Sequence, residues 1–343
     1  MSTGPKEAVT GAILGDINVD QYGVFPALPE KGQGMNTDDL KVGLGGAAMN
    51  LTQMLKALGA EPYPLASTGS SFPGEIAREL MEELDIERAG IETLPGRSGL
   101  FFCAITPDGE RTMFGYRGVN REPVDYSRRA ESLPEPGEWD FLLLSAYLFL
   151  HEEQRRQLMS WLKGIEAELD DIMVGTVISH LFSRRAGAEG PLDLELLDIC
   201  DVIFLNEDEF NNLAGDIRPE LIKEMAEDLG LEEIVISRGR RGLILYSRQL
   251  GDVAEVAGFE IEPLDTTGAG DSMAAGFIWA KGRGFKPVEA ALMGNFCGAA
   301  CSLGYGVTAA ARALKEKLNF EVFLQEELQR DKLQRMLNYL TVD

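Results

Sequence analysis

The feature that most constrains the fold is an alternation of short, almost wholly apolar runs with longer segments of helical periodicity. The runs FLLLS at 141–145 and VIFL at 202–205 are nearly all apolar, as strands covered on both faces must be. Further strand-like runs lie at 9–14, 64–67, 172–177 and 234–237, and helical periodicity marks 47–58, 74–84, 152–168, 192–199 and 219–229. This order predicts an α/β fold with a three-layer αβα core and a mainly parallel sheet.

Two stretches interrupt the alternation. Residues 18–43 and 97–120 have the pattern of β-hairpins, the second with a PDGE turn between two apolar runs. Because neither belongs to the wound sheet, we expect both to form one small β lid. No linker or repeat divides the chain, so we expect a single domain over 1–343 with an amphipathic helical extension at 313–343.

The charge and composition of the chain limit the kinds of partner that it can bind. The chain has 56 acidic and 32 basic residues, a formal net charge of −24, which disfavours nucleic acid and anionic membranes. No apolar run has the length of a signal peptide or membrane span, so we expect a cytoplasmic protein. The four cysteines show no CxxC spacing, and the two histidines, His151 and His180, stand in unrelated contexts. We therefore expect buried thiols and neither a histidine-rich metal site nor a Ser/His/Asp triad.

The run DTTGAGDSMAAGF at 265–277 is the strongest chemical signal. Gly268, Ala269 and Gly270 precede a helix that we expect to begin at Asp271. Unshielded backbone amides and the helix dipole together make an anion site there. From these residues alone, Asp271 is either a helix cap or a reactive carboxylate, and the run does not decide between them.

This run resembles the C-terminal signature of the ribokinase-like (PfkB) carbohydrate kinase family. The resemblance implies that Asp271 is the general base that takes the proton from the hydroxyl attacking ATP. It also implies that Gly268, Ala269 and Gly270 form the anion hole for the transferring phosphoryl group.

Two stretches near the N-terminus resemble the sugar-binding part of the same family. They are KVGLGGAAMNLTQMLKALGA at 41–60, similar to the family's Gly-Gly signature, and GDINVDQYG at 15–23. The resemblance implies that the substrate-binding residues are Asn18, Asp20, Gly45, Gly46 and Asn50.

Later stretches are similar to the family's nucleotide and cation sites. FLNEDEF, IVISRGRRGLILYS and ALMGNFCGAACSLGYG imply ATP contacts at Asn206, Ser237, Gly239, Gly242 and Asn295. Glu209 is expected to hold Mg²⁺ through water, and Asp265, Thr267 and Gly306 are expected to form a K⁺ site. Without the resemblance, Asn206 and Glu209 are an ordinary capping box, the glycines at 239 and 242 an ordinary hairpin, and RGRR at 238–241 a solvated turn or phosphate ligands.

Two departures from the family leave the acceptor open. Gly175, Thr176 and Ser179 stand where the family often has Asp-x-Asn-x-Arg, and STGSSFPGE at 67–75 lacks a common acidic residue. Ribose, fructose, 2-keto-3-deoxygluconate, adenosine and other nucleosides all remain open as acceptors.

The predicted function is an ATP- and Mg²⁺-dependent kinase that phosphorylates a hydroxymethyl group of a sugar or ribosyl compound. A homodimer through the exposed lid edge is also expected. A non-catalytic sugar or nucleotide sensor on the same fold is the alternative. A dehydrogenase is disfavoured, because the GLGGAA fingerprint at 43–48, with Glu61 as its ribose ligand, does not directly follow the first strand.

Overall fold

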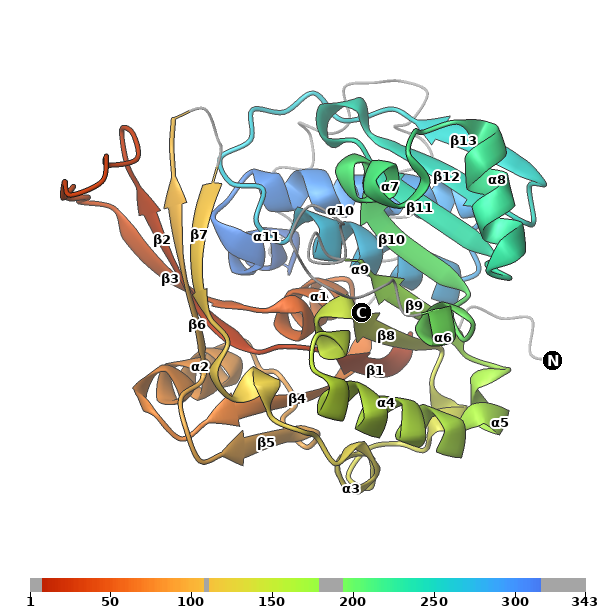
Figure 1. Ribbon diagram of the computed structural model, residues 1–343, viewed down its shortest axis with the longest axis horizontal. Coiled ribbons are helices and arrows are strands. Elements are labelled where there is room, and N and C mark those ends of the chain that lie inside the picture. Colours follow the sequence, from red (N-terminus) through yellow and green to blue (C-terminus); the bar gives the residue numbers. More distant parts are fainter. Residues whose placement is uncertain (1–7, 108–110, 179–193, 316–343) are drawn as a thin grey trace.

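The computed structural model describes residues 8–107, 111–178 and 194–315. Its larger sheet has nine strands in the order β13-β12-β11-β10-β9-β8-β1-β4-β5 (Figure 1). Neighbours run parallel except β11–β12 and β12–β13. The strands are β1 Thr10–Leu14, β4 Glu61–Gly69, β5 Ile91–Leu94, β8 Phe141–Ser145, β9 Met173–Val177, β10 Val202–Asn206, β11 Glu233–Ser237, β12 Leu243–Ser247 and β13 Asp252–Val256. The mainly parallel sheet is confirmed.

Helices pack on both faces of this sheet. Phe141 and Leu143 belong to one hydrophobic cluster and Leu142 and Leu144 to another, so successive residues of β8 face opposite layers. On the first face lie α1 Ala47–Ala57, α2 Phe72–Glu83, α9 Ala269–Gly282, α10 Pro287–Ser302 and α11 Gly306–Lys315. On the second lie α3 Tyr126–Ala130, α4 Glu152–Gly164, α5 Glu166–Leu169, α6 Leu194–Leu197, α7 Glu207–Ala214 and α8 Pro219–Asp228. The three-layer prediction is therefore correct.

Several predicted boundaries need correction. The helix expected at 152–168 is divided at Ile165 into α4 and α5, directly after Gly164, a poor helix former. Strand β5 was not predicted, because IETL carries little strand signal. Helix α6 covers the described part of the helix expected at 192–199. His180, Ser179 and most of the predicted extension, residues 316–343, lie outside the described residues.

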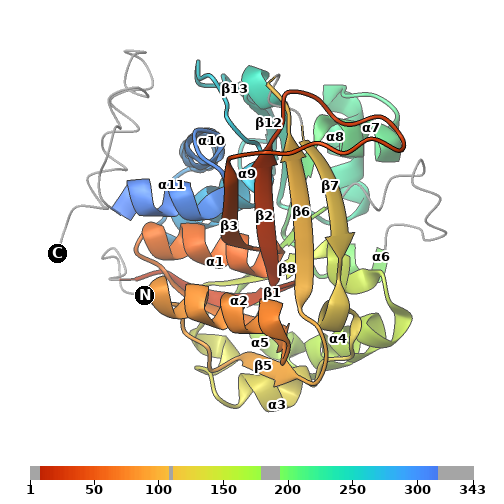
Figure 2. The same cartoon turned by 90° about the vertical axis from the view of Figure 1, so that its left-hand side faces the viewer.

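The two predicted hairpins form one small sheet, here called the lid sheet (Figure 2). Its strands are β2 Asn18–Val24, β3 Leu40–Gly45, β6 Gly99–Ile105 and β7 Arg111–Tyr116, in the order β3-β2-β6-β7. Each hairpin is antiparallel, and β2 and β6 join them in parallel. This confirms that two distant segments make one small sheet beside the core.

The two faces of the lid sheet differ in character. Strand register places Asp20, Phe101 and Met113 on the face toward the core. The opposite face carries four exposed apolar side chains, here called the outer patch: Leu40, Val42, Phe114 and Tyr116. A large apolar area exposed on one sheet face suits contact with another surface.

Other predictions from composition can also be compared with the structure. All four cysteines are buried free thiols, as expected. His151 is half-buried at the start of α4, and burial lowers its pKa. In the ranges described, no helix combines the length and the apolar character that crossing a membrane requires.

Candidate active site

A cavity of about 650 Å³ lies where the carboxyl ends of the parallel strands meet the lid sheet. Strand β1 has β4 on one side and β8 on the other, so the chain changes winding direction there, and ligands of doubly wound sheets bind beside such a point. Asp16 follows β1, Ser145 ends β8, Asn206 ends β10 and Ser237 ends β11, and all four line the cavity. The volume suits a small-molecule site.

The predicted anion loop forms the N-terminus of α9. The helix begins at Ala269 rather than at Asp271, with Gly268 as its N-cap at φ +77°. A side chain at Gly268 would be strained at this φ, and its Cβ would lie 2.4 Å from Val307 Cγ2. The Ala269 amide donates to Thr266 O at 3.2 Å, whereas the other first-turn amides have no acceptor within the helix. The loop therefore presents backbone donors to the cavity, though not the Ala269 amide.

Asp265 holds this loop from behind the cavity. Its Oδ1 accepts from the Thr267 amide at 3.0 Å and the Thr267 hydroxyl at 2.7 Å, and its Oδ2 accepts from the Gly306 amide at 3.0 Å. Thr267 lines the cavity, but Asp265 and Gly306 do not. Asp265 thus ties the anion loop to the first residue of α11.

Asp271 lies in the first turn of α9 and faces the cavity. Its Oδ2 accepts from Asn50 Nδ2 at 2.8 Å, so the predicted substrate ligand Asn50 contacts the predicted base. Burial raises the pKa of Asp271 to about 6, against the lowering effects of the Asn50 hydrogen bond and of Arg111. At neutral pH this group is a carboxylate that is more basic than an exposed aspartate.

Asp20 and Asn18, both on β2 of the lid sheet, line the cavity. Tyr22 donates its hydroxyl to Asp20 Oδ2 at 3.1 Å, while Asp20 Oδ1 is buried without a hydrogen-bond partner among the described residues. Burial, with Asp265 and Asp271 nearby, raises the pKa of Asp20 to about 7, although the Tyr22 hydrogen bond opposes this. Asn18 Oδ1 accepts from Asn120 Nδ2 at 2.8 Å. An unpartnered buried carboxylate oxygen suits a hydroxyl donor.

The two predicted glycines beside Asp20 play different parts. Gly46 lines the cavity at φ +88° and is the N-cap of α1. Gly45 does not line it but lies directly behind Asp20, since an added Cβ would fall 1.9 Å from Asp20 Oδ2. Gly45 therefore makes room for the Asp20 carboxylate, and its contact with a substrate stays a prediction.

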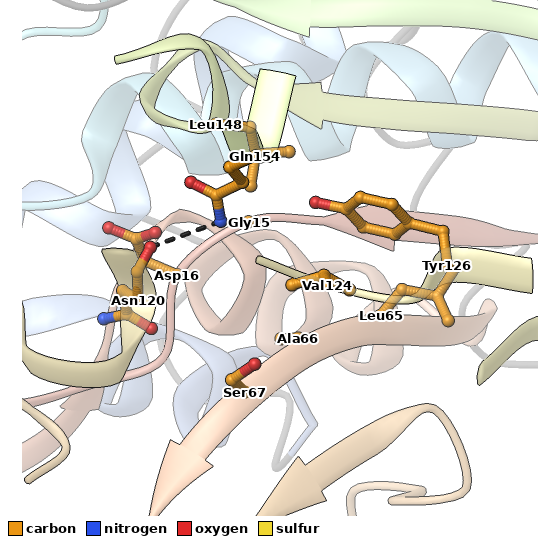
Figure 3. Close-up of a pocket in the computed structure, with 10 residues that line it drawn as sticks. All are labelled: Gly15, Asp16, Leu65, Ala66, Ser67, Asn120, Val124, Tyr126, Leu148 and Gln154. Atoms are coloured by element: carbon orange, nitrogen blue, oxygen red, sulfur yellow. Dashed lines mark hydrogen bonds between the residues drawn. The ribbon is translucent and has the colours of Figure 1, made fainter. Parts of the chain in front are cut away.

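Asp16 is a site residue that the sequence did not reveal as one. It lines the cavity, and Arg117 Nη2 lies 2.9 Å from its Oδ2. Burial raises the pKa of Asp16 to about 6 despite Arg117. Figure 3 shows Asp16 and Asn120 beside a second cavity of about 10 Å³, where Gln154 Nε2 donates to Asn120 O at 3.3 Å. A void of that size holds at most one water molecule.

Asn206 and Glu209 form the capping box that the spacing also allowed. Asn206 Oδ1 accepts from the Glu209 amide and Glu209 Oε2 accepts from the Asn206 amide, both at 2.8 Å. Both residues line the cavity, and burial raises the pKa of Glu209 to about 7. In the part of the chain described, no three His, Cys, Asp or Glu side chains converge as metal ligands. The protein thus offers Glu209 as one carboxylate here, which fits an ion held mainly by phosphates and water.

The part of the cavity beside β11 and β12 combines polar and apolar groups. Ser237, Gly239, Gly242 and Asn295 all line the cavity. The backbone at 233–247 is a hairpin, with a short 3₁₀ helix at Gly239–Arg241 between β11 and β12, so the hairpin interpretation of these glycines is confirmed and their contact with ATP stays a prediction. Apolar side chains line the same cavity from 259 to 299, namely Phe259, Ile261, Pro263, Met273 and Ala299.

The arginines of RGRR separate into two groups. Arg240 lines the cavity. Arg238 pairs with Glu255 at 2.9 Å, and Arg241 pairs with Glu207. Arg238 and Arg241 are therefore engaged in ion pairs with Glu255 and Glu207, and Arg240 is the member of the group that lines the cavity.

Other lining residues come from the lid sheet. Phe101, Arg111 and Met113 line the cavity, and Arg111 Nη1 donates to Thr266 Oγ1 at 2.5 Å. The two-residue spacing of Arg111 and Met113 was the available signal, because alternate residues of a strand share a face. Without the partner strand, the sequence does not tell which face that is.

Comparison with known proteins agrees with this geometry. Residues 8–314 match the profile of the pfkB family carbohydrate kinases. The chain is 28% identical over 288 residues to a cytidine kinase of Thermococcus kodakarensis, covering 81% of this chain and 90% of that protein. It is 26% identical over 277 residues to a ribokinase of Haemophilus influenzae, covering 79% and 85%.

A solved structure shows the same fold. The ribokinase of Arabidopsis thaliana, complexed with ribose and ATP, superposes with a TM-score of 0.71 at 20% identity, covering 91% of this chain and 99% of that one. The large sheet, the lid sheet and the family match over nearly the whole chain lead to one conclusion. The chain belongs to the PfkB family of carbohydrate kinases and has the ribokinase-like fold.

Proposed function

We propose that the protein transfers the γ-phosphoryl group of ATP to a hydroxymethyl group of a sugar or nucleoside. The position of Asp271 is the observation that supports this proposal most directly. Asp271 accepts a hydrogen bond from Asn50 and lies in the first turn of α9, and it lines the same cavity as Asp20 and Ser237. The relatives add support, since one is a cytidine kinase and a protein of the same fold binds ribose and ATP.

In this proposal Asp271 accepts the proton of the attacking hydroxyl, and its raised pKa suits that task. Backbone amides at the start of α9 stabilise negative charge on the transferring phosphoryl group. Asn18, Asp20 and Gly46 bind the acceptor, and Asn206, Ser237, Gly239, Gly242 and Asn295 bind ATP. Glu209 would help to hold Mg²⁺, which would supply neutralisation of the phosphate charge.

The test is acceptor-dependent ADP formation. The purified full-length chain is incubated with ATP, Mg²⁺ and one compound at a time from a set of pentoses, hexoses, sugar acids and nucleosides. ADP is followed by a coupled assay and the product mass by mass spectrometry. We expect at least one compound to raise ADP formation far above the rate without acceptor and to gain one phosphoryl group. Binding of ATP and a sugar with no acceptor-dependent ADP would contradict the proposal and favour the sensor.

A further inference from the structure

Tyr22 is a buried polar residue to which the proposed function assigns no part. It lies on β2 two residues after Asp20, so both side chains are on the same face of the strand, but Tyr22 does not line the cavity. Its ring packs with Cys103 and Ile105 of β6. Its hydroxyl donates to Asp20 Oδ2 at 3.1 Å, whereas Asp20 Oδ1 is buried without a hydrogen-bond partner among the described residues. A hydroxyl group bound at Oδ1 would therefore act on the carboxylate that holds Tyr22.

The Tyr22 hydroxyl also lies against the first residue of α11. A Cβ added to Gly306 would fall 2.5 Å from the hydroxyl oxygen and 2.9 Å from Cζ of Tyr22, so a side chain there would displace the ring. Gly43 of β3 is close as well, since its added Cβ would fall 3.3 Å from Tyr22 Cε2. The ring is thus packed between the lid sheet and α11, and a closely packed side chain passes a displacement on to its neighbours.

Gly306 is in turn hydrogen-bonded to the residue that supports the anion loop. Its amide donates to Asp265 Oδ2 at 3.0 Å, and Asp265 Oδ1 accepts from the amide and the hydroxyl of Thr267 at 3.0 and 2.7 Å. Thr267 directly precedes Gly268, the N-cap of α9. A continuous series of contacts therefore leads from the Tyr22 hydroxyl to the backbone of the anion loop.

We infer that Tyr22 is a positioning residue that couples acceptor binding to ATP binding, although it contacts neither ligand. An acceptor hydroxyl held by Asp20 orders the anion loop through Tyr22 and Gly306. This inference rests on the proposed function and adds to it a dependence of ATP affinity on the acceptor. A ligand that orders a shared set of contacts leaves less ordering for the second ligand to bring about. Such coupling is reciprocal and changes affinities by about 5- to 150-fold.

The first test measures this coupling by calorimetry on the full-length protein. The probes are adenylyl imidodiphosphate with Mg²⁺ in place of ATP, and whichever of ribose, fructose and cytidine binds most tightly as the acceptor. We expect saturating acceptor to increase the affinity of the wild-type protein for the ATP analogue at least about fivefold. In Tyr22→Phe, which loses only the hydroxyl, that gain should fall below about twofold. A wild-type protein without the gain, or one that binds none of the three acceptors, would overturn the inference.

A purely local role of Tyr22 gives a different result. If Tyr22 only supports Asp20, Tyr22→Phe binds the acceptor more weakly, yet saturating acceptor still increases the affinity for the ATP analogue as in the wild type. That outcome would overturn the inference. The matched control is Tyr246→Phe, which changes a buried tyrosine of β12 outside the cavity and should keep the full gain.

Hydrogen exchange on the wild-type protein gives a second test that does not depend on the folding of a variant. Saturating acceptor without nucleotide should slow exchange of the Gly306 amide at least about fivefold, because this amide donates to Asp265 and Gly306 does not line the cavity. An unchanged exchange rate at Gly306 would overturn the inference. If no compound supports ADP formation, the kinase proposal fails, but the affinities and the exchange rate still show whether the two ligands are coupled.

Discussion

Two opposing effects set the pKa of Asp271. Asp271 is buried enough for its pKa to rise to about 6, yet the Asn50 hydrogen bond and Arg111 both favour its charged form. The balance leaves a carboxylate at neutral pH that is a better base than an exposed one. Its position in the first turn of α9 also allows a purely structural role, so the two roles need to be separated by experiment.

The variant Asp271→Asn separates them. Gly268 and not Asp271 is the N-cap of α9, so the variant removes only a favourable charge from the first turn and the melting temperature should stay within a few degrees. Loss of a general base typically costs about 10² to 10⁴-fold, and we expect kcat to fall in that range while ATP and acceptor still bind. Steady-state kinetics on the best acceptor, with a melting curve, measures this.

The control is Glu220→Gln, which changes an acidic residue in the first turn of another helix, α8, outside the cavity. It should leave kcat unchanged. An Asp271→Asn enzyme that melts normally and keeps more than about a tenth of wild-type turnover would show that Asp271 is not the base.

At the scale of elements, side-chain hydrogen bonds attach the anion loop and the lid sheet to the core. Asp265 joins the loop to the start of α11. Asn120 joins the lid sheet to the end of β1, because it bonds both backbone groups of Ile17 and the side chain of Asn18. Such attachments fix the base of an element and leave its far end less constrained.

We predict that a monovalent cation stiffens the loop at Asp265, Thr267 and Gly306. Activity should rise when K⁺ replaces a large organic cation at constant ionic strength, and Asp265→Ala should abolish that rise. Because Asp265 also accepts two hydrogen bonds from Thr267 and one from the Gly306 amide of α11, the variant should melt at a lower temperature as well. A wild-type enzyme with equal rates in K⁺, Na⁺ and the organic cation would exclude the site.

We predict that residues 18–43 and 97–120 move more than the core when no acceptor is bound. Strand β7 is mostly exposed, whereas β8 is buried throughout, so the amides of the lid sheet should exchange hydrogen faster than those of β8. Adding acceptor and an ATP analogue should slow exchange in the lid sheet and leave β8 unchanged. Equal, slow exchange in both sheets of the free protein would contradict a closing lid.

The same elements show which parts of the fold and of the site can be predicted from the sequence. Both hairpins and the buried parallel strands were predictable, because a two-residue period and unbroken apolar runs are local signals. The pairing of β2 with β6 leaves no local signal in the sequence, so it was not predictable that Arg111 and Met113 face the cavity. The role of Asp16 was not predictable either. Asp16 pairs with Arg117 across about 100 residues of chain. Gly45 lies against the Asp20 carboxylate. Neither contact has a fixed spacing in sequence that could be recognised in advance.

At the scale of the whole molecule, an acidic protein buries carboxyl groups at its centre and exposes apolar groups on the lid sheet. The net charge is −24, and the pKa values of Asp16, Asp20, Glu209 and Asp271 are all raised, mainly by burial. The outer patch lies on the opposite face of the sheet that covers them. The outer patch bears on the oligomeric state, and the buried carboxyl groups bear on how the stability depends on pH.

We predict a homodimer that forms through the outer patch. Phe114 and Tyr116 are 63% and 52% exposed, and covering such a surface is favourable. Light scattering after size exclusion should give twice the chain mass, and Phe114→Lys should give the monomer mass. The control Leu250→Lys changes an exposed apolar residue in the turn before β13 and should remain dimeric. A wild-type monomer at all protein concentrations would exclude this assembly.

We predict that the ligand-free protein is more stable at pH 5.5 than at pH 8. A carboxyl group whose folded-state pKa is raised favours the folded state when protonated, so its contribution is lost as pH rises through about 6 to 7. Asp85 and Asp252 have lowered pKa values and act only at lower pH, below their ordinary range. Melting curves at constant ionic strength measure this.

The variant Asp20→Asn should raise the melting temperature at pH 8 and reduce its dependence on pH, because it removes one buried charge. A wild-type protein that melts at the same or a higher temperature at pH 8 than at pH 5.5 would contradict the prediction.

The order of the lining residues along the chain has a consequence for how such a protein can diversify. Asp16, Asp20, Asn50 and Phe101 precede residue 121, whereas the nucleotide-side residues follow residue 200. Under the proposed function, a recombination event or a designed exchange that replaces the N-terminal third would bring new acceptor-binding residues and leave the proposed ATP contacts unchanged, provided the new segment keeps the Asn50 to Asp271 hydrogen bond. If the proposed assignments hold, the choice of acceptor and the use of ATP are encoded in separate segments and can be inherited separately.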